Sequence, residues 1–315
     1  MPLFFFCSGY FFKPINNFRQ VISFSKKKIK GLYLPYIKWC IIFLLLHNIF
    51  FNLNIYNNFY GFNNIVSQPY SATDFIKKIL NIILAMRGAE QLLGGFWFLR
   101  VLFLSSILLA IISQLKNKFK ISHSTIVICL LCILYFAKIS HLRAPIIGDI
   151  PLILYGIIFL YLGYLYKKIE KIDFYKISTF LLLSLCVAVG SYSNYSNMLL
   201  FEYTDIASYI FFATLGILSI FCISSIFTKQ KIATPLIYIG DNTMIILSLH
   251  FLSFKLVSLF KIFIFNLSFK QLACFPVINE YNYIFWILYS IVGICLPLTL
   301  LCLYHKLKNK FNIAI

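Results

Sequence analysis

The sequence predicts an all-α fold, a polytopic bundle of about nine transmembrane helices, and three observations support this prediction. Hydrophobic residues make up 61% of the 315 residues and charged residues only 12%, whereas soluble domains contain roughly 45–50% apolar and about 25% charged residues. The apolar residues fall in runs of about 20, the length that crosses a bilayer core. The basic residues, which bring the net charge to +19, form short clusters between these runs. This pattern excludes a soluble globular enzyme.

Eight apolar runs have about the length of a membrane span. They cover residues 35–51, 95–113, 124–139, 150–166, 177–192, 206–227, 243–265 and 284–304. Lys and Arg are concentrated in alternate connections, at residues 13–30, 116–120, 167–176, 229–231 and 306–310. Because cytoplasmic loops of membrane proteins collect basic residues, we expect these connections and the C-terminus to be cytoplasmic. The same interleaving leaves no single basic patch or arginine-rich arm, which disfavours nucleic acid as a partner.

The first apolar segment, residues 1–12, is too short to span a bilayer comfortably. It must nevertheless cross from outside to inside to bring Lys13 to the cytoplasm. It has neither the basic leader nor the small-residue cleavage site of a signal peptide. We therefore expect that a preceding helix, running from inside to outside, is missing from this chain.

The connection over residues 52–94 is long and rich in Asn, and we expect it to be extracytoplasmic. Within it, residues 75–86 place apolar side chains on one face of a helix, with Lys77, Lys78 and Asn81 opposite. This pattern predicts an amphipathic helix that lies in the outer interface or caps a cavity. An alternative interpretation is that the Asn content reflects an A/T-biased coding sequence.

The nine cysteines predict neither a disulfide framework nor a metal site. Seven of them lie in or beside apolar runs, where a thiol behaves as a small hydrophobic side chain. Cys129 and Cys132 form a C-x-x-C pair, but no second pair and no His at ligand spacing accompanies them. We therefore expect no metal.

Four strings along the chain carry a family resemblance. MPLFFFCSGYFF at residues 1–12 is followed by KKKIKGLYLPY at residues 26–36. GFWFLRVLF at residues 95–103 is similar to WFL-x-x-LF, and YIGDNTMIILSLHFLSFKLV at residues 238–257 is similar to G-x-N-[ST]-x-x-I-x-x-x-H. In this order the strings resemble the acyltransferase 3 family of integral-membrane O-acyltransferases, in particular its fucose 4-O-acetylase branch. The resemblance covers residues 1–315 as a single domain and implies a fold of ten transmembrane helices.

The resemblance also implies a segment before residue 1. Members of the family carry a first helix with a basic residue and a His that is regarded as catalytic. They read H-M-P-L-F-F where this chain starts with Met1. We therefore expect a truncated chain or a misassigned start, and impaired catalysis as a result.

Acyl transfer from acetyl-CoA to a sugar hydroxyl, which the resemblance implies, needs a base, donors for the developing oxyanion and a cationic site for the coenzyme's phosphates. His250 is the best remaining base, because a titratable group within a span is costly unless it is paired or lines a polar cavity. Arg100, one turn inside the span that starts at Gly95, is the second catalytic candidate. The alternatives are that His250 packs against a neighbouring helix and that Arg100 extends outward to the interface.

Lys27 and Lys30 are the candidate contacts for acetyl-CoA, because they lie where family members carry a basic motif between the second and third helices. Lysine lacks the bidentate fork of arginine, so we expect coenzyme binding to be weaker or differently arranged. The alternative is that these lysines follow the positive-inside rule or contact anionic lipid headgroups.

Three further residues are candidates for substrate binding. Trp97 is one, and its alternative role is that of an interfacial aromatic residue. Glu90, in the short connection before it, is expected to pair with Arg100 or Arg87. Asn242 lies where a cytoplasmic loop becomes a helix, and its alternative role is an ordinary helix N-cap.

The outward connection after residue 140 contains His141 and Arg143, which either shape an acceptor pocket or are simply solvated. His47, His123 and His305 lie at the edges of predicted spans, and no role is predicted for them.

These observations predict an O-acetyltransferase of the bacterial inner membrane that acts on a hydroxyl of a surface polysaccharide or its precursor. The expected partners are an acyl-CoA, a carbohydrate or lipid-linked glycan acceptor, and membrane lipids. One alternative is a polytopic transporter or glycan flippase, although neither a repeat nor matched pairs of broken helices are visible. A second alternative is an inactive remnant of the family.

Overall fold

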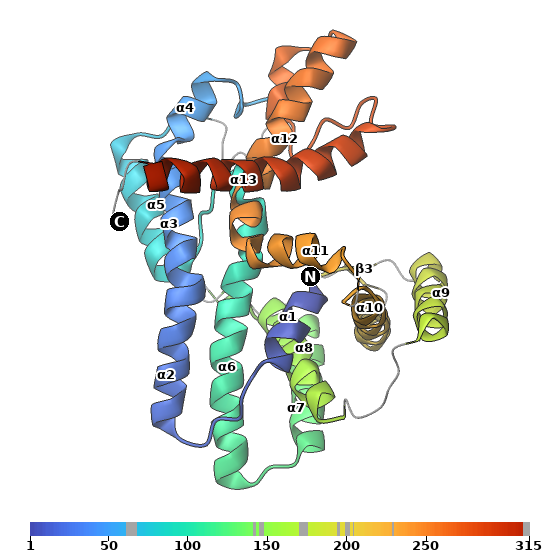
Figure 1. The fold of residues 1–315 in the computed structure, drawn as a ribbon. Helices are drawn as coiled ribbons and strands as arrows, with labels where there is room; N and C mark the ends of the chain where they lie inside the picture. Colours follow the sequence, from blue (N-terminus) through green and yellow to red (C-terminus); the bar gives the residue numbers. More distant parts are fainter. Residues whose placement is uncertain are drawn as a thin grey trace. The chain divides into compact units, whose positions relative to one another are not determined.

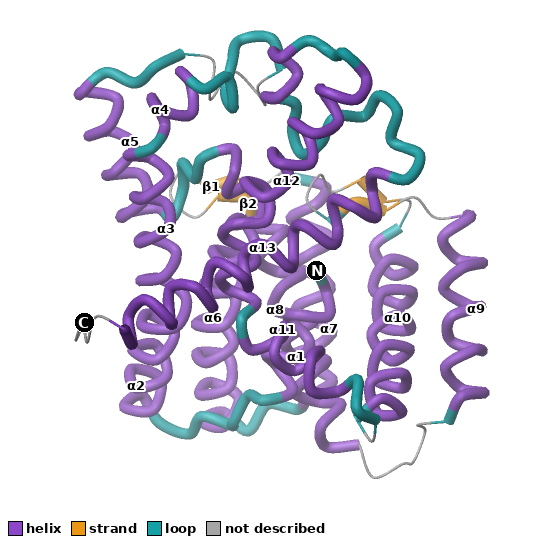
Figure 2. The backbone as a smooth tube through the Cα atoms, turned by 45° about the horizontal axis from the view of Figure 1, so that its top comes forward, coloured by secondary structure: helices purple, strands orange, loops and turns teal. Residues whose placement is uncertain are grey.

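The computed structural model describes residues 1–60, 68–140, 143–144, 148–169, 176–193, 196–198, 202–203, 205–228 and 230–310. Within these ranges the chain is helical apart from loops and two short antiparallel pairs, which confirms the all-α class (Figure 1 and Figure 2). β1 (Arg143–Ala144) pairs with β2 (Gly148–Asp149), and β3 (Ser196–Asn197) pairs with β4 (Glu202–Tyr203).

The chain forms two compact units. Unit 1 contains Met1–Tyr33 and Phe98–Ala233, and unit 2 contains Leu34–Trp97 and Thr234–Ile315. The elements of unit 1 are α1 (Pro2–Tyr10), α2 (Phe18–Lys28), the π-helix η1 (Ile29–Tyr33), most of α6 (Trp97–Phe119), α7 (His123–Ile139), α8 (Ile150–Ile169), α9 (Ile177–Ser193) and α10 (Ile206–Phe227). The elements of unit 2 are α3 (Leu34–Leu45), α4 (His47–Asn52), α5 (Ala72–Ala85), the 3-10 helix η2 (Gln91–Phe96), α11 (Ala233–Asp241), α12 (Thr243–Phe265), the 3-10 helix η3 (Phe269–Ala273) and α13 (Phe285–Lys310).

Five helical segments in the described ranges are long and apolar enough to cross a membrane. They are Gln91–Phe119, which joins η2 to α6, and the helices α8, α10, α12 and α13. The apolar helices α7 and α9 are shorter. These helices are those of an integral membrane protein, while the count of nine spans and the cytoplasmic C-terminus stay predictions.

The predicted span over residues 35–51 is divided in the structure. Helical residues run through α2, η1 and α3 to Leu45, and α4 begins at His47 after a break at Leu46. Pro35 would clash with the carbonyl of Gly31 in a regular α-helix, and the wider π turn of η1 removes this conflict. After the break, α4 buries His47 and Phe50. Hydropathy therefore located the apolar residues but not the break between the two helices.

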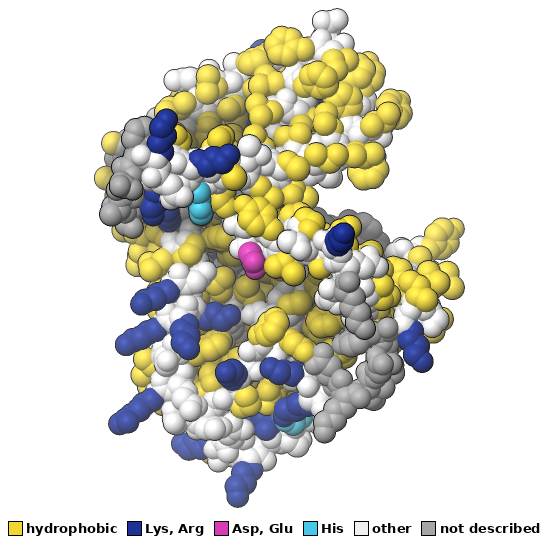
Figure 3. All heavy atoms as spheres, viewed as in Figure 1, with side chains coloured by type: hydrophobic (Ala, Val, Ile, Leu, Met, Phe, Trp, Pro, Cys, Tyr) yellow, Lys and Arg dark blue, Asp and Glu magenta, His cyan; other side chains and the backbone are white. Residues whose placement is uncertain are grey.

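In unit 1, α8 is the most buried helix and α1 packs directly on it. A Cβ atom at Gly9 would collide with the carbonyl oxygen of Leu160, and one at Gly163 would collide with that of Phe6. Small residues at such positions let two helix backbones approach closely. Figure 3 shows Lys and Arg side chains gathered over α2 and α6 of this unit.

In unit 2, the predicted amphipathic helix is present as α5. The Ser71 hydroxyl caps its first turn and Asp74 completes a capping box. Ile82 is fully buried, whereas the exposed fractions of Ile76 and Leu84 are 60% and 75%. The exposed apolar face of α5 is therefore available to contact the bilayer interface.

Candidate functional site

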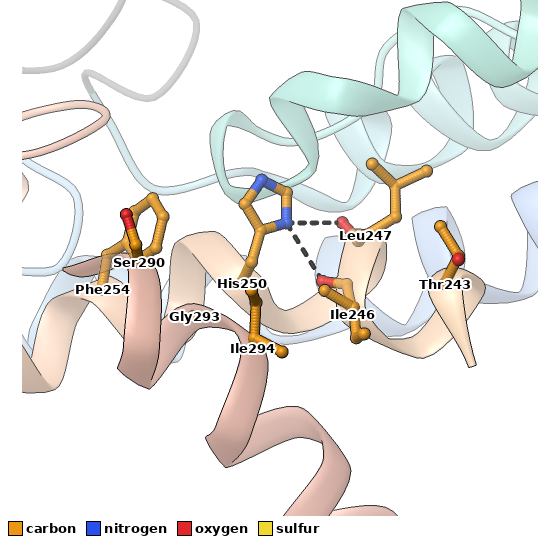
Figure 4. Close-up of a pocket in the computed structure, with 8 residues that line it drawn as sticks. All are labelled: Thr243, Ile246, Leu247, His250, Phe254, Ser290, Gly293 and Ile294. Atoms are coloured by element: carbon orange, nitrogen blue, oxygen red, sulfur yellow. Dashed lines mark hydrogen bonds between the residues drawn. The ribbon is translucent and has the colours of Figure 1, made fainter. Parts of the chain in front are cut away.

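The candidate site is a pocket between two helices of unit 2, and its volume is about 300 Å³ (Figure 4). Its lining residues are Thr243, Ile246, Leu247, His250 and Phe254 of α12 and Ser290, Gly293 and Ile294 of α13. Both helices are candidate membrane spans. The pocket therefore contains the residue that the sequence predicts as a base, in a mainly hydrocarbon setting.

Hydrogen bonds within α12 determine which nitrogen of His250 is left as an acceptor. Nδ1 lies 2.9 Å from the carbonyl oxygen of Leu247 and 3.1 Å from that of Ile246 (Figure 4). Carbonyl oxygens only accept, so Nδ1 carries a proton. No described residue forms a hydrogen bond with Nε2. In the neutral ring, Nε2 therefore offers a free lone pair.

The two hydroxyl groups of the pocket already donate to backbone carbonyl oxygens three or four residues earlier in the chain. Thr243 Oγ1 donates to the carbonyl oxygen of Gly240 at 2.6 Å, and Ser290 Oγ donates to that of Trp286 at 2.8 Å. Back-bonding of this kind is common for Ser and Thr within helices. The imidazole is thus the principal polar group that the lining side chains present to the pocket.

A glycine pair in η2 lies directly against α12 beside the imidazole. A Cβ atom at Gly95 would come within 2.9 Å of Leu247 Cδ1 and 3.9 Å of His250 Cε1. At Gly94 it would come within 2.7 Å of Phe275 Cζ. Because larger residues would push η2 away, Gly94 and Gly95 allow the segment between Glu90 and Trp97 to approach the helix that carries His250.

Aromatic rings and a buried lysine hold the loop before α13 next to this site. The Phe251 ring lies 3.9 Å from the His250 ring and 4.7 Å from the Phe275 ring, measured between centroids. Lys255, which is 3% exposed, donates from Nζ to the carbonyl oxygens of Leu272 and Cys274, each at 2.8 Å. Lys255 therefore holds the loop directly before Phe275.

Glu90 pairs with His47, a residue for which the sequence analysis predicted no role. Oε2 of Glu90 lies 2.8 Å from Nδ1 of His47, and both side chains are fully buried. Nε2 of the same imidazole lies 3.1 Å from the carbonyl oxygen of Gln68, and the Tyr70 ring stacks on it at 3.4 Å. Burial and the negative charge of Glu90 raise the pKa of the Tyr70 hydroxyl. The cost of a titratable group in an apolar run, which drew attention to His250, was also a signal for His47.

The remaining predicted residues of unit 2 lie near the pocket-forming segments. Asn242 occupies the N-cap position of α12, but its side chain donates to the carbonyl oxygen of Tyr238 at 2.8 Å and forms no side-chain cap. Trp97 is half-buried at the first position of α6, directly after η2.

Comparison with protein families decides the assignment. The model of acyltransferase 3, described as an acyltransferase domain, matches residues 1–306. The chain belongs to the acyltransferase 3 family. No curated protein and no solved structure matches it. The family resemblance seen in the four sequence strings is thereby confirmed, while the fucose 4-O-acetylase branch stays a prediction.

The predicted coenzyme contacts of this acyltransferase lie in unit 1. Lys27 and Lys30 are exposed. Between them, Lys28 turns inward, donates to Ser8 Oγ at 3.3 Å and lies over the Phe24 ring. Burial lowers the pKa of Lys28. The basic cluster therefore contains exposed ammonium groups available to an anion and one that joins α2 to α1.

Other predicted residues are less fully described. Arg100 is half-buried in α6. Membership of the family does not identify a ligand for its side chain. His141 lies outside the described residues, and only the backbone of Arg143 is described. In the described part of the acyltransferase, no group of three His, Cys, Asp or Glu residues is placed to hold a metal ion.

Proposed function

We propose that this acyltransferase transfers an acetyl group from acetyl-CoA to a hydroxyl group of a surface-glycan sugar or its lipid-linked precursor, in the bacterial inner membrane. Membership of the acyltransferase 3 family indicates the acyl transfer and implies an acyl donor. The long apolar helices place the enzyme in a membrane. The sugar acceptor and the acetyl donor are part of the proposal, which the four sequence strings support.

The observation that carries the proposal is the orientation of His250. Its Nδ1 is bound to backbone carbonyl oxygens of α12, and its Nε2 is the acceptor beside the pocket. A general base must present a lone pair to the proton it removes, and a fixed tautomer supplies that lone pair without reorganisation. Among the described residues, this arrangement makes His250 the proposed catalytic base.

In the proposed reaction, Nε2 of His250 accepts the proton of the acceptor hydroxyl group. The hydroxyl oxygen then bonds to the carbonyl carbon of the thioester, and the carbon–sulfur bond breaks. The departing thiolate takes the proton from the imidazolium, so the products are an O-acyl sugar and the free thiol of coenzyme A. Arg100, in unit 1, stays the second proposed catalytic residue, because a cationic group can stabilise the negative charge that develops in acyl transfer.

Lys27 and Lys30 are the proposed contacts for the coenzyme's phosphates, because both ammonium groups are exposed. Trp97 and Asn242 are the proposed substrate contacts. Glu90 is buried and paired with His47. We therefore propose that Glu90 affects substrate binding indirectly. It would do so by fixing the position of η2, which follows it directly in the chain.

The test is acyl transfer by the purified protein in lipid nanodiscs. Acetyl-CoA labelled in the acetyl group is supplied with surface-glycan acceptors, and both the labelled product and the free thiol are measured. His250→Ala is expected to lower kcat by about 100-fold or more, the contribution of a general base, without a change in thermal unfolding. Ser290→Ala, which removes an already engaged hydroxyl group from the pocket, is the matched control. Full activity in His250→Ala, or no transfer by the wild-type protein to any acceptor, would contradict the proposal.

A further inference from the structure

The lining of the pocket beside His250 is chemically uniform. Ile246, Leu247, Phe254 and Ile294 contribute hydrocarbon, and Gly293 contributes no side chain. The hydroxyl groups of Thr243 and Ser290 donate to the backbone carbonyl oxygens of Gly240 and Trp286. A ligand in this pocket therefore meets only a few acceptors, Nε2 of His250 and the oxygens of the two donating hydroxyl groups, and otherwise meets apolar surface.

Such a lining fits poorly to a sugar ring. Each sugar hydroxyl that leaves water without a new hydrogen bond costs free energy, and sites for polar ligands place several polar groups to fix the ligand's orientation. A hydrocarbon chain makes no such demand and gains free energy from burial. Of the two substrates in the proposed reaction, the acyl group of the donor is the one that the pocket matches.

The size of the pocket exceeds what an acetyl group requires. Its volume of about 300 Å³ is roughly ten times the ~30 Å³ that one water molecule occupies in the liquid. The methyl group of an acetyl donor would fill a small part of it and leave the rest of the apolar lining without contacts. A well-matched apolar ligand fills such a space, because unfilled volume forfeits dispersion contacts.

We propose that this pocket binds the hydrocarbon chain of the acyl donor and that the enzyme accepts acyl-CoA donors with chains longer than acetyl, such as butyryl and hexanoyl. This inference rests on the proposed function, because it takes His250 as the base at the reacting carbonyl group. The chain then lies along α12 and α13, between Phe254 and Ile294.

Two residues define the width of the proposed chain site. A Cβ atom at Gly293 would collide with the Phe254 ring, so Gly293 lets α13 pack closely against that ring. Ile294, the next residue, is 37% exposed and lines the open side of the pocket. A larger side chain at residue 294 has room to turn into the pocket, and it would shorten the space available to an acyl chain.

The first experiment measures kcat/KM for acetyl-, butyryl-, hexanoyl- and octanoyl-CoA with the wild-type protein in nanodiscs. Each added methylene group is expected to raise kcat/KM by about fourfold until the pocket is full, the factor that corresponds to ~0.8 kcal/mol per buried CH₂. Ile294→Phe is expected to lower the ratio of hexanoyl to acetyl transfer by about tenfold or more. Ile291→Phe is the matched control, because Ile291 is an exposed isoleucine of α13 outside the pocket, and it should leave the ratio unchanged.

A second experiment detects the acyl chain without relying on turnover. A hexanoyl-CoA with a photoreactive group on the chain is irradiated with the protein, and labelled peptides are identified by mass spectrometry. Labels on Ile246, Leu247 or Ile294 that unlabelled hexanoyl-CoA competes away support the proposal. Labels elsewhere, or pocket labels that only a phospholipid competes away, would overturn it.

The outcomes separate the two proposals. Acetyl transfer with a chain-length ratio that Ile294→Phe does not alter would overturn the acyl-chain pocket and leave the proposed function intact. No transfer with any donor would overturn the proposed function, and photolabelling would then decide the pocket alone.

Discussion

Nδ1 of His47 lies 2.8 Å from Oε2 of Glu90, and neither side chain is exposed to solvent. Nε2 of the same ring lies 3.1 Å from the carbonyl oxygen of Gln68, so an oxygen atom lies within hydrogen-bond distance of each ring nitrogen. The pair joins α4 to the residue that precedes η2. Since Gly95 of η2 packs against Leu247 and His250, the ion pair fixes a segment that borders the proposed base.

Breaking this ion pair should destabilise the protein strongly. His47→Leu and Glu90→Leu each leave one fully buried group without its salt-bridge partner, which typically costs about 3–5 kcal/mol. The double variant removes both groups and should lose less than the sum of the two single variants. Thermal unfolding of the wild-type protein, the two single variants and the double variant in one detergent gives the coupling free energy between the two side chains. Additive losses would show that the two side chains do not interact as an ion pair.

Removing the amino group of Lys255 should release the loop before α13. Lys255→Met keeps the length of the side chain but leaves the carbonyl oxygens of Leu272 and Cys274 without their donor, at a cost of about 2–4 kcal/mol. The measurement is the rate at which a maleimide labels Cys274, quantified by peptide mass spectrometry, and it should rise severalfold. Lys270→Met is the control, because Lys270 is exposed on the same loop. Equal labelling rates in the two variants would contradict the role of Lys255.

The close packing of α1 on α8 makes glycine necessary at two positions of unit 1. Gly9→Ala and Gly163→Ala place a methyl group against a backbone carbonyl group and should each cost about 2 kcal/mol or more. Gly31→Ala is the matched control, because a Cβ atom there meets nothing within 4 Å, and it should be neutral or stabilise by about 0.5–1 kcal/mol. Thermal unfolding midpoints provide the comparison. Similar midpoints in all three variants would contradict the packing.

The spans were the most predictable part of the fold, for a local reason. The predicted ranges 206–227 and 243–265 agree with α10 and α12, because each apolar run follows a polar residue at the helix N-cap position, Asp205 or Asn242. The break at Leu46 was not predictable in this way. It turns His47 toward Glu90, a partner 43 residues away, and hydropathy carries no information on such a contact.

The site was predictable in part for the same reason. A histidine within a span is visible in the sequence because of its cost, and this singled out His250. The residues that complete its pocket, Ser290, Gly293 and Ile294, come from another helix. They look like ordinary span residues, so only the packing of α12 on α13 identifies them. Glu90 was noticed as an isolated acid, but its pairing with His47 was not predictable, because the two residues are 43 positions apart.

The first turn of α5 should depend on pH through Asp74. The hydroxyl and backbone N–H of Ser71 donate to Oδ2 of Asp74 at 2.7 and 3.0 Å, and these hydrogen bonds lower the pKa of Asp74. A group with a lowered folded pKa stabilises the fold above its unfolded pKa of about 3.9, and this contribution is lost as the pH falls through the folded pKa. Hydrogen exchange of residues 71–75, corrected for intrinsic rates, should therefore show the turn opening below about pH 4. Asp74→Asn has no carboxylate to protonate, so it should abolish this dependence, and an unchanged pH profile in that variant would assign the opening to another group.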